Sequence, residues 1–267
     1  MRNLFLLFCL PLLLMSCDGY NKLLKSTSYE EKKAAAIRYY DDKKYDKADG
    51  LLDQLLTLSK GTPDAENIYY YYCRTQIALK NYYAADYHCK NFAQNFPLNP
   101  FAEEIDFLHI QAMFYDCPEF ELDQTNTFKT LESIQIFINQ HPESSKIEAC
   151  NSMMDDLRNR LQKKALNYAE LFYKMEDFRA AAIAYRNLLN DYPEVENKEN
   201  LHFRVVDSYY KLAQNSIESK KRERLEQTLQ SLKEFKEEYP KTSYLSETER
   251  IFASCNQALE KMNAEKK

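Results

Sequence analysis

A recurring segment that ends on proline constrains this chain more than any other feature. An alanine or threonine stands twelve positions before each proline, and a Tyr, Phe, Leu or Thr stands fifteen positions before it. Apolar residues between them recur at the spacing of a helix with one buried face. Such self-similarity indicates that one short structural unit is stacked along the chain. The segments are KNYYAADYHCKNFAQNFP, TFKTLESIQIFINQHP, MEDFRAAAIAYRNLLNDYP and RLEQTLQSLKEFKEEYP, with a looser first copy, KKYDKADGLLDQLLTLSKGTP.

Each copy has the pattern of the second helix of a helical hairpin, and another apolar-periodic segment, such as NYAELFYKMEDF, precedes it. This resembles the tetratricopeptide repeat, in which proline ends the second helix. The copies start 37, 45, 51 and 47 residues apart, which exceeds the standard repeat and predicts insertions or longer helices, one insertion being residues 116–127. We therefore predict an all-α solenoid of about five tetratricopeptide-like helical hairpins. The copies start at Tyr45, Tyr82, Thr127, Phe178 and Leu225.

Composition restricts the possible functions. Glycine occurs only 3 times, whereas tyrosine occurs 21 times and phenylalanine 15 times, which disfavours glycine-loop nucleotide sites and hairpin-rich β folds. The formal net charge is −5 and no basic stripe stands out, so we expect no nucleic-acid partner.

The N-terminal segment has the features of a lipoprotein signal peptide. Arg2 precedes an almost uncharged run, residues 3–15, which is too short to span a bilayer and contains Pro11. The run ends in LMSC, which resembles the lipobox of bacterial lipoproteins, whose cysteine becomes the acylated N-terminus. We predict that residues 1–16 are removed and that Cys17 carries palmitate and other acyl chains, which hold the chain at a membrane. The alternative is an incidental cysteine after an ordinary signal.

No catalytic or metal site is predicted. The four histidines are scattered, and His88 and Cys89 are adjacent on a helix, so their side chains point in different directions. No pair of cysteines has the C-x-x-C spacing of a metal or redox site. Cys73 and Cys89 lie eight residues either side of Asn81, a predicted hairpin turn, and we favour reduced core thiols over a disulfide. We expect no enzyme activity and no cofactor.

Four consecutive tyrosines, Tyr69, Tyr70, Tyr71 and Tyr72, cannot all enter one helix-packed core. The favoured interpretation is that these rings pack against neighbouring repeats. The alternative is that part of this aromatic surface forms a groove for an apolar peptide end.

Longer motifs resemble the BamD family, the lipoproteins of the outer-membrane β-barrel assembly machinery. They are FINQHPESSKIEACNSMMDDLRNRL, then YAELFYKMEDFRAAAIAYRNLLNDYP and VVDSYYKLA, with LDQTNT resembling the form from Bacteroidota. The resemblance implies a chain that is anchored in the outer membrane, faces the periplasm and performs no reaction. It also implies binding to the POTRA domains of BamA through the C-terminal repeats. The N-terminal repeats would receive the C-terminal signals of unfolded outer-membrane proteins and assist their insertion.

The resemblance places the predicted sites in different repeats. Arg179 and Arg186 are the candidate BamA contacts, and Tyr69–Tyr72 form the candidate substrate-peptide groove. Ile183 and Ala184 stand where proteobacterial members usually carry an Asn-Arg pair. Asp18 would retain a lipoprotein at the inner membrane if the source follows the enteric sorting rule.

Two alternatives remain open. One is a different tetratricopeptide-repeat lipoprotein that scaffolds another envelope complex, and the other is a lipid-anchored enzyme. The predicted divisions are 1–16 for the signal peptide, 17–28 for a lipidated linker, 29–142 for repeats 1–3, 143–255 for repeats 4–5 with a capping helix, and 256–267 for a polar tail.

Overall fold

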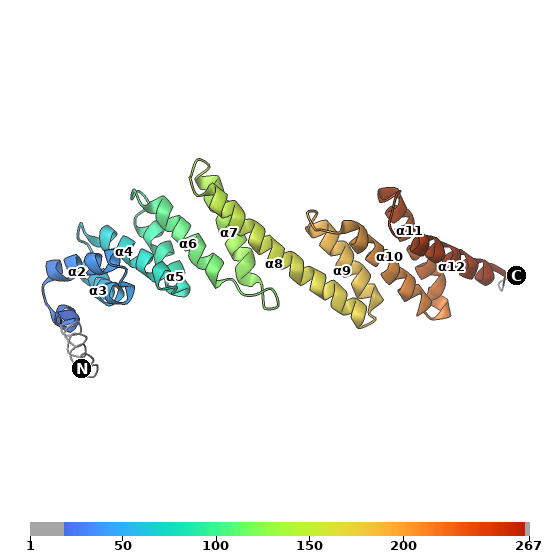
Figure 1. Cartoon of the computed structure of the whole chain (residues 1–267), viewed down its shortest axis with the longest axis horizontal. Coiled ribbons are helices and arrows are strands. Elements are labelled where there is room, and N and C mark those ends of the chain that lie inside the picture. Colours follow the sequence, from blue (N-terminus) through green and yellow to red (C-terminus); the bar gives the residue numbers. More distant parts are fainter. Residues whose placement is uncertain (1–18, 265–267) are drawn as a thin grey trace, which may run out of the picture. The chain divides into compact units, whose positions relative to one another are not determined.

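A computed structural model describes residues 19–264, which contain helices and no strand. The chain runs as successive helical hairpins, and the predicted all-α solenoid of five hairpins is confirmed (Figure 1). A short helix, residues 19–25, precedes the first hairpin. The hairpins are α2 (Tyr29–Asp41) with α3 (Tyr45–Leu58), α4 (Ala65–Ala78) with α5 (Tyr82–Asn95), α6 (Ala102–Asp116) with α7 (Thr125–Gln140), α8 (Ile147–Lys174) with α9 (Phe178–Asp191), and α10 (Lys198–Gln214) with α11 (Glu218–Glu238), followed by α12 (Leu245–Ala264).

These helices belong to two compact units. Unit 1 holds the described residues up to 118 together with 122–155, and unit 2 holds 119–121 together with 156–264. In unit 1, α4 packs on both α2 and α6, so the first helices of neighbouring repeats touch as well as the two helices of each hairpin. Stacked hairpins bury a continuous core in this way. The division falls inside α8, whereas the sequence analysis places it between residues 142 and 143.

Three hairpins share one kind of turn. Lys43, Lys80 and Glu176 adopt left-handed backbone conformations, with φ of 59°, 60° and 62°. The N–H of the residue that follows each of them bonds back to the carbonyl five positions earlier, as Asn81 does to Gln76 at 2.9 Å. This hydrogen bond closes the last turn of the first helix. Glycine usually fills the left-handed position, but this glycine-poor chain places charged residues there.

The aligned prolines end the second helices as predicted. α5, α7, α9 and α11 each stop two residues before a proline. The residue just before proline is disfavoured in the helical region, because the proline ring clashes with its backbone. His141 and Tyr192, for example, have φ of −127° and −129°.

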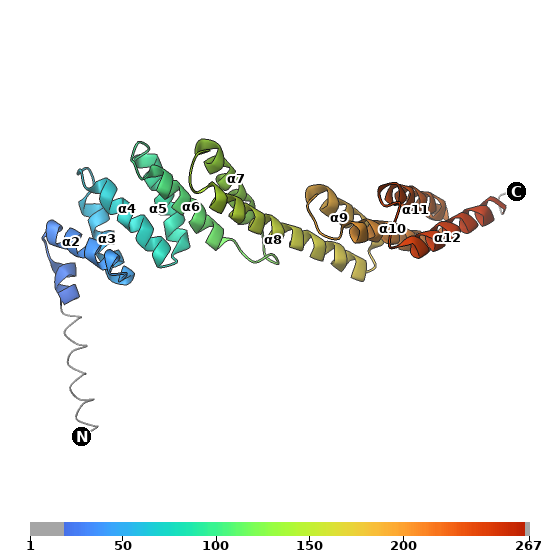
Figure 2. The same ribbon diagram turned by 45° about the horizontal axis from the view of Figure 1, so that its top comes forward.

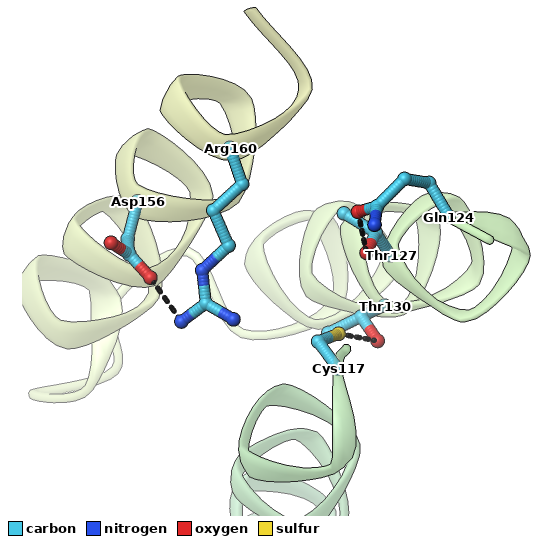
Figure 3. Close-up of polar contacts among 6 residues, drawn as sticks. All are labelled: Cys117, Gln124, Thr127, Thr130, Asp156 and Arg160. Atoms are coloured by element: carbon cyan, nitrogen blue, oxygen red, sulfur yellow. Dashed lines mark hydrogen bonds and ion pairs between the residues drawn. The ribbon is translucent and has the colours of Figure 1, made fainter. Parts of the chain in front are cut away.

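Long helices and one loop explain the irregular repeat spacing. α8 has 28 residues and α11 has 21, and residues 117–124 form the loop between α6 and α7. In and beside that loop, the Thr127 hydroxyl donates to Gln124 Oε1 at 2.8 Å, and Cys117 Sγ lies 3.3 Å from Thr130 Oγ1 (Figure 3). The first contact fixes the end of the loop on the first turn of α7, and the second joins the residue after α6 to α7.

In three hairpins, a glutamate near the start of the first helix binds the turn that follows the same hairpin. Glu66 in α4 accepts a hydrogen bond from the Asn99 side chain. Glu103 in α6 accepts from Ser144 Oγ at 2.6 Å. Glu199 in α10 accepts from Thr242 Oγ1 at 2.6 Å and from the Ser243 N–H at 2.7 Å. We call these three contacts the glutamate joints.

Both ends of the described chain are helical. Residues 19–25, assigned from the sequence to the lipidated linker, form a helix that packs on the first hairpin. α12 continues to Ala264, through most of the segment assigned to a polar tail, because Ala258, Leu259 and Met262 pack on the core of unit 2. Figure 2 shows this last helix from a second direction.

Candidate binding surfaces

Cys17, the predicted lipidation site, lies outside the described residues. Of the helices between residues 19 and 264, none combines the length and the apolar content that a membrane span requires. Across the same residues, no three His, Cys, Asp or Glu side chains converge in a way that could hold a metal ion.

The four consecutive tyrosines point to different neighbours, and none of them is fully exposed. Tyr69 is half-buried against α5, with its ring edge-on to Phe92 at 5.8 Å and to Phe96 at 6.3 Å. Its hydroxyl lies 3.2 Å from His88 Nδ1. Burial raises the pKa of Tyr69, so this hydroxyl stays protonated and can donate.

The other three rings fill spaces between repeats. Tyr70 is buried, stacks on Phe101 at 4.3 Å, and donates its hydroxyl proton to Glu104 at 3.0 Å. Tyr71 meets the Tyr40 ring at 5.2 Å. Tyr72 is buried in the core of the first hairpins, where burial raises its pKa to about 12. Packing against neighbouring repeats therefore accounts for these three rings.

An open cavity of about 990 Å³ lies beside Tyr69 in unit 1. It is bordered by α3, by the turn after α3, by the start of α4 and by α5. Burial lowers the pKa of His88, so its imidazole is neutral near pH 7 and can accept a hydrogen bond. Its lining includes Leu56, Tyr69, Tyr87, His88, Asn91, Asn95 and Phe96.

Of these lining residues, only Tyr69 belongs to the groove predicted from the sequence. Tyr87, Asn91 and Asn95 follow at i, i+4 and i+8 and so share one face of α5. That mixed polar and aromatic face was a usable signal. That this face of α5 lies beside the end of α3 depends on tertiary packing, which the spacing of residues does not predict.

Arg179 and Arg186 lie on one exposed face of α9, with the exposed Ile183 between them. The Arg186 guanidinium lies 5.4 Å over the ring of the buried Tyr209 and borders a pocket of about 260 Å³. Among the described ion pairs, none involves Arg179 or Arg186. Arg179 is one of the cations that lower the pKa of Glu223 on α11, after Lys220, which is the main cause.

An apolar stripe along the last turns of α8 and the residue that follows it was not predicted as a surface. Tyr168, Leu171 and Met175 are 48%, 48% and 67% exposed. Their i, i+3 and i+7 spacing places them on one helix face. In the sequence this spacing equally fits a core face, so periodicity alone does not distinguish the two.

Cys73 and Cys89 are free thiols within one buried cluster between α4 and α5. A hydrogen bond to Cys73 and burial raise the pKa of the Cys89 thiol well above its ordinary value. A protonated, buried thiol is a poor nucleophile, so this pair packs as small core residues.

Comparisons with known proteins give a match to one protein family. The family model named YfiO and described as "Outer membrane lipoprotein" matches residues 24–225. Among curated proteins, no sequence match was found. Similar solved structures include a thermophilic TPR protein of Thermus thermophilus (14% identity, 86% of this chain and 100% of that chain, TM-score 0.33) and the TPR2AB domain of yeast Sti1 in a pHSP90 complex (14%, 85% and 98%, TM-score 0.39). A third is a tetratricopeptide repeat protein of Parabacteroides merdae (12%, 88% and 88%, TM-score 0.35).

Proposed function

Because the chain belongs to the YfiO family of outer membrane lipoproteins, we propose that it is a non-catalytic subunit of the β-barrel assembly machinery. In this role it is anchored through Cys17, faces the periplasm, binds the POTRA domains of BamA and assists the insertion of outer-membrane proteins. The family match over residues 24–225 is the observation that carries the proposal.

Purification from native outer membrane tests the partner. A barrel protein with POTRA domains should be recovered in an amount comparable to this chain. Recovery of a different envelope complex without such a protein would instead support the alternative scaffold lipoprotein.

The anchor is tested separately. A palmitate analogue supplied to cells should label the wild-type chain and should not label Cys17→Ala. Equal labelling of the two would refute acylation at this residue.

The exposed face of α9 is the proposed BamA contact. The Arg side chain presents a planar fork that can pair with both oxygens of a carboxylate. Arg186→Glu together with Arg179→Glu should therefore reduce BamA recovery while the helix content stays unchanged.

Arg250→Glu is the matched control for that experiment. Arg250 is an exposed arginine on α12 whose guanidinium lies 5.8 Å over the ring of the buried Tyr210, as Arg186 lies over Tyr209. If Arg250→Glu lowers BamA recovery as much as the α9 pair does, the contact is not specific to α9.

The aromatic cavity beside Tyr69 is the proposed site for the ends of unfolded substrates. Of the run Tyr69–Tyr72, Tyr69 is the member that lines the cavity, so it is the first to test. Tyr69→Ala and Tyr87→Ala should reduce crosslinking to unfolded barrel peptides and spare BamA recovery. Tyr83→Ala is the control, because Tyr83 is exposed one turn earlier on α5 and does not line the cavity.

A further inference from the structure

The segment directly after the proposed anchor is part of the first hairpin's core. Residues 19–25 form a helix, and Tyr20, Leu23 and Leu24 pack against the buried cluster of α2 and α3. Partial burial of these three apolar side chains removes part of their surface from water and so stabilises the docked helix. The helix is therefore held on the hairpin rather than tethered loosely to it.

Gly50 on α3 leaves the space that Tyr20 of this helix occupies. A Cβ atom added at Gly50 would collide with the hydroxyl oxygen of Tyr20. The Tyr20 ring also lies edge-on to Tyr39 at 5.8 Å, with Lys47 Nζ 5.8 Å from its centroid. Tyr39 is near the end of α2 and Lys47 is near the start of α3, so Tyr20 docks beside the turn that joins them.

Lys32 fixes the other end of the same helix. It is buried, and its ammonium donates to the Leu24 carbonyl oxygen at 3.1 Å and to Gln54 Oε1 at 2.5 Å. A cation at a helix C-terminus binds a carbonyl that has no partner within the helix and interacts favourably with the helix dipole. Residues 19–25 are thus attached to the hairpin at both ends.

We infer that the docked helix holds the α2–α3 turn against the phospholipid headgroups of the membrane that receives the acyl chains. Only Asp18 separates Cys17 from Gly19, and two peptide units span at most about 7 Å. α3 is about 20 Å long, so the turn after it lies that much farther along the helix from the end that the anchor reaches. This inference rests on the proposed acylation of Cys17.

The sequence has no tryptophan, so a single introduced tryptophan can report its own distance from the bilayer. Asp46 and Lys60 are exposed residues at opposite ends of α3. The acylated full-length variants Asp46→Trp and Lys60→Trp are each reconstituted into vesicles of phosphatidylethanolamine and phosphatidylglycerol that carry a nitroxide on the headgroup. Fluorescence of Asp46→Trp should be quenched strongly, and fluorescence of Lys60→Trp should be quenched much less.

A flexible insertion provides the control. Twelve Gly and Ser residues inserted after Asp18 have a root-mean-square length of about 20 Å, and they leave the hairpin and its docked helix unchanged. The difference in quenching between the two positions should then be lost. Equal quenching without the insertion, or a difference that survives it, would overturn the inference.

Acyl labelling of the same samples separates this inference from the proposed anchor. Labelled protein with no positional difference in quenching refutes the docked arrangement and leaves the anchor intact. Absence of the label refutes the anchor, and the inference with it.

Discussion

The same tyrosine position meets a different partner in each unit. Tyr40 in unit 1 and Tyr173 in unit 2 both stand three residues before a left-handed turn residue. Each lies edge-on to the first aromatic ring of the following helix, at 5.6 Å from Tyr45 and 5.5 Å from Phe178.

Across the boundary to the next repeat, the partners of these two tyrosines differ. Tyr40 meets the Tyr71 ring at 5.2 Å. Tyr173 lies under Lys211 Nζ at 4.5 Å and donates its hydroxyl proton to Asp207. These two hairpins thus share an aromatic pair at the turn, while the partner across the boundary is an aromatic ring in unit 1 and charged side chains in unit 2. In the α4–α5 hairpin, Ile77 stands at the position of these tyrosines.

The substitution with the largest expected effect on the free energy of unfolding tests whether the two units unfold separately. Phe92 is fully buried in unit 1, and Phe92→Ala should lower the free energy of unfolding of that unit by about 3–5 kcal/mol. Hydrogen exchange read by mass spectrometry should show lost protection in α4–α6 and unchanged protection in α10–α12. Loss of protection in both units to the same extent would show that they unfold together.

A smaller effect is expected from overpacking in unit 2. Ala182 is fully buried on the alanine-rich helix α9, where a small side chain permits close helix contact. Ala182→Leu should destabilise unit 2 by about 1–3 kcal/mol, measured by urea denaturation. Asn187→Leu, on the exposed face of α9, is the control and should change little. Similar losses from both substitutions would argue against a tightly packed site at Ala182.

The contact of Tyr173 with Asp207 and Lys211 in unit 2 is tested by removing the tyrosine hydroxyl. Tyr173→Phe removes the hydrogen bond to Asp207 and should cost about 0.5–1.5 kcal/mol in the free energy of unfolding. Tyr168→Phe, at an exposed tyrosine on the same helix, should have no measurable effect. If Tyr173→Phe leaves the free energy of unfolding unchanged, the contact between Lys211 and the ring, rather than the hydroxyl, stabilises this contact between repeats.

The smallest effect concerns pH, and it has the same sign in both units. Burial lowers the pKa of His88 in unit 1 and of His202 in unit 2. The unfolded chain therefore takes up these protons first, and stability is lost as pH falls below about 6.5. His202 also lies 3.5 Å from Glu238, which opposes the shift, while Lys198 reinforces it.

His202→Gln should therefore flatten the pH dependence of unit 2 stability between pH 7 and pH 5 and leave that of unit 1 unchanged. Urea denaturation midpoints at several pH values, with His88→Gln as the reciprocal variant, provide the measurement. An unchanged slope in His202→Gln would assign the pH dependence to other groups.

Periodicity was sufficient to predict the hairpins, their proline ends and the positions where most second helices start. It placed the fifth copy's start at Leu225, although α11 begins at Glu218, because the polar first turns of that helix carry no apolar signal. The division inside α8 was also not predicted, since nothing in the residue pattern changes at residue 155.

The candidate sites depended more on packing between helices. Tyr70, Tyr71 and Tyr72 gave a strong local signal, yet their surroundings come from Phe101, Tyr40 and the first hairpin, which are distant in sequence or in other helices. The cavity beside Tyr69 arises where α5 passes the end of α3. Arg179 and Arg186 were easier to place, because their spacing alone puts them on one exposed face.

The glutamate joints have a consequence for rearranging the chain. Glu66, Glu103 and Glu199 each bind a polar group in the turn that follows their own hairpin, although the rings and cations nearby differ. The α6–α7 hairpin has both halves of this contact, because Asn99 before α6 binds Glu66 and Glu103 in α6 binds Ser144. A second copy of this hairpin, inserted directly after the first, would therefore meet a glutamate contact of the same kind at both of its ends.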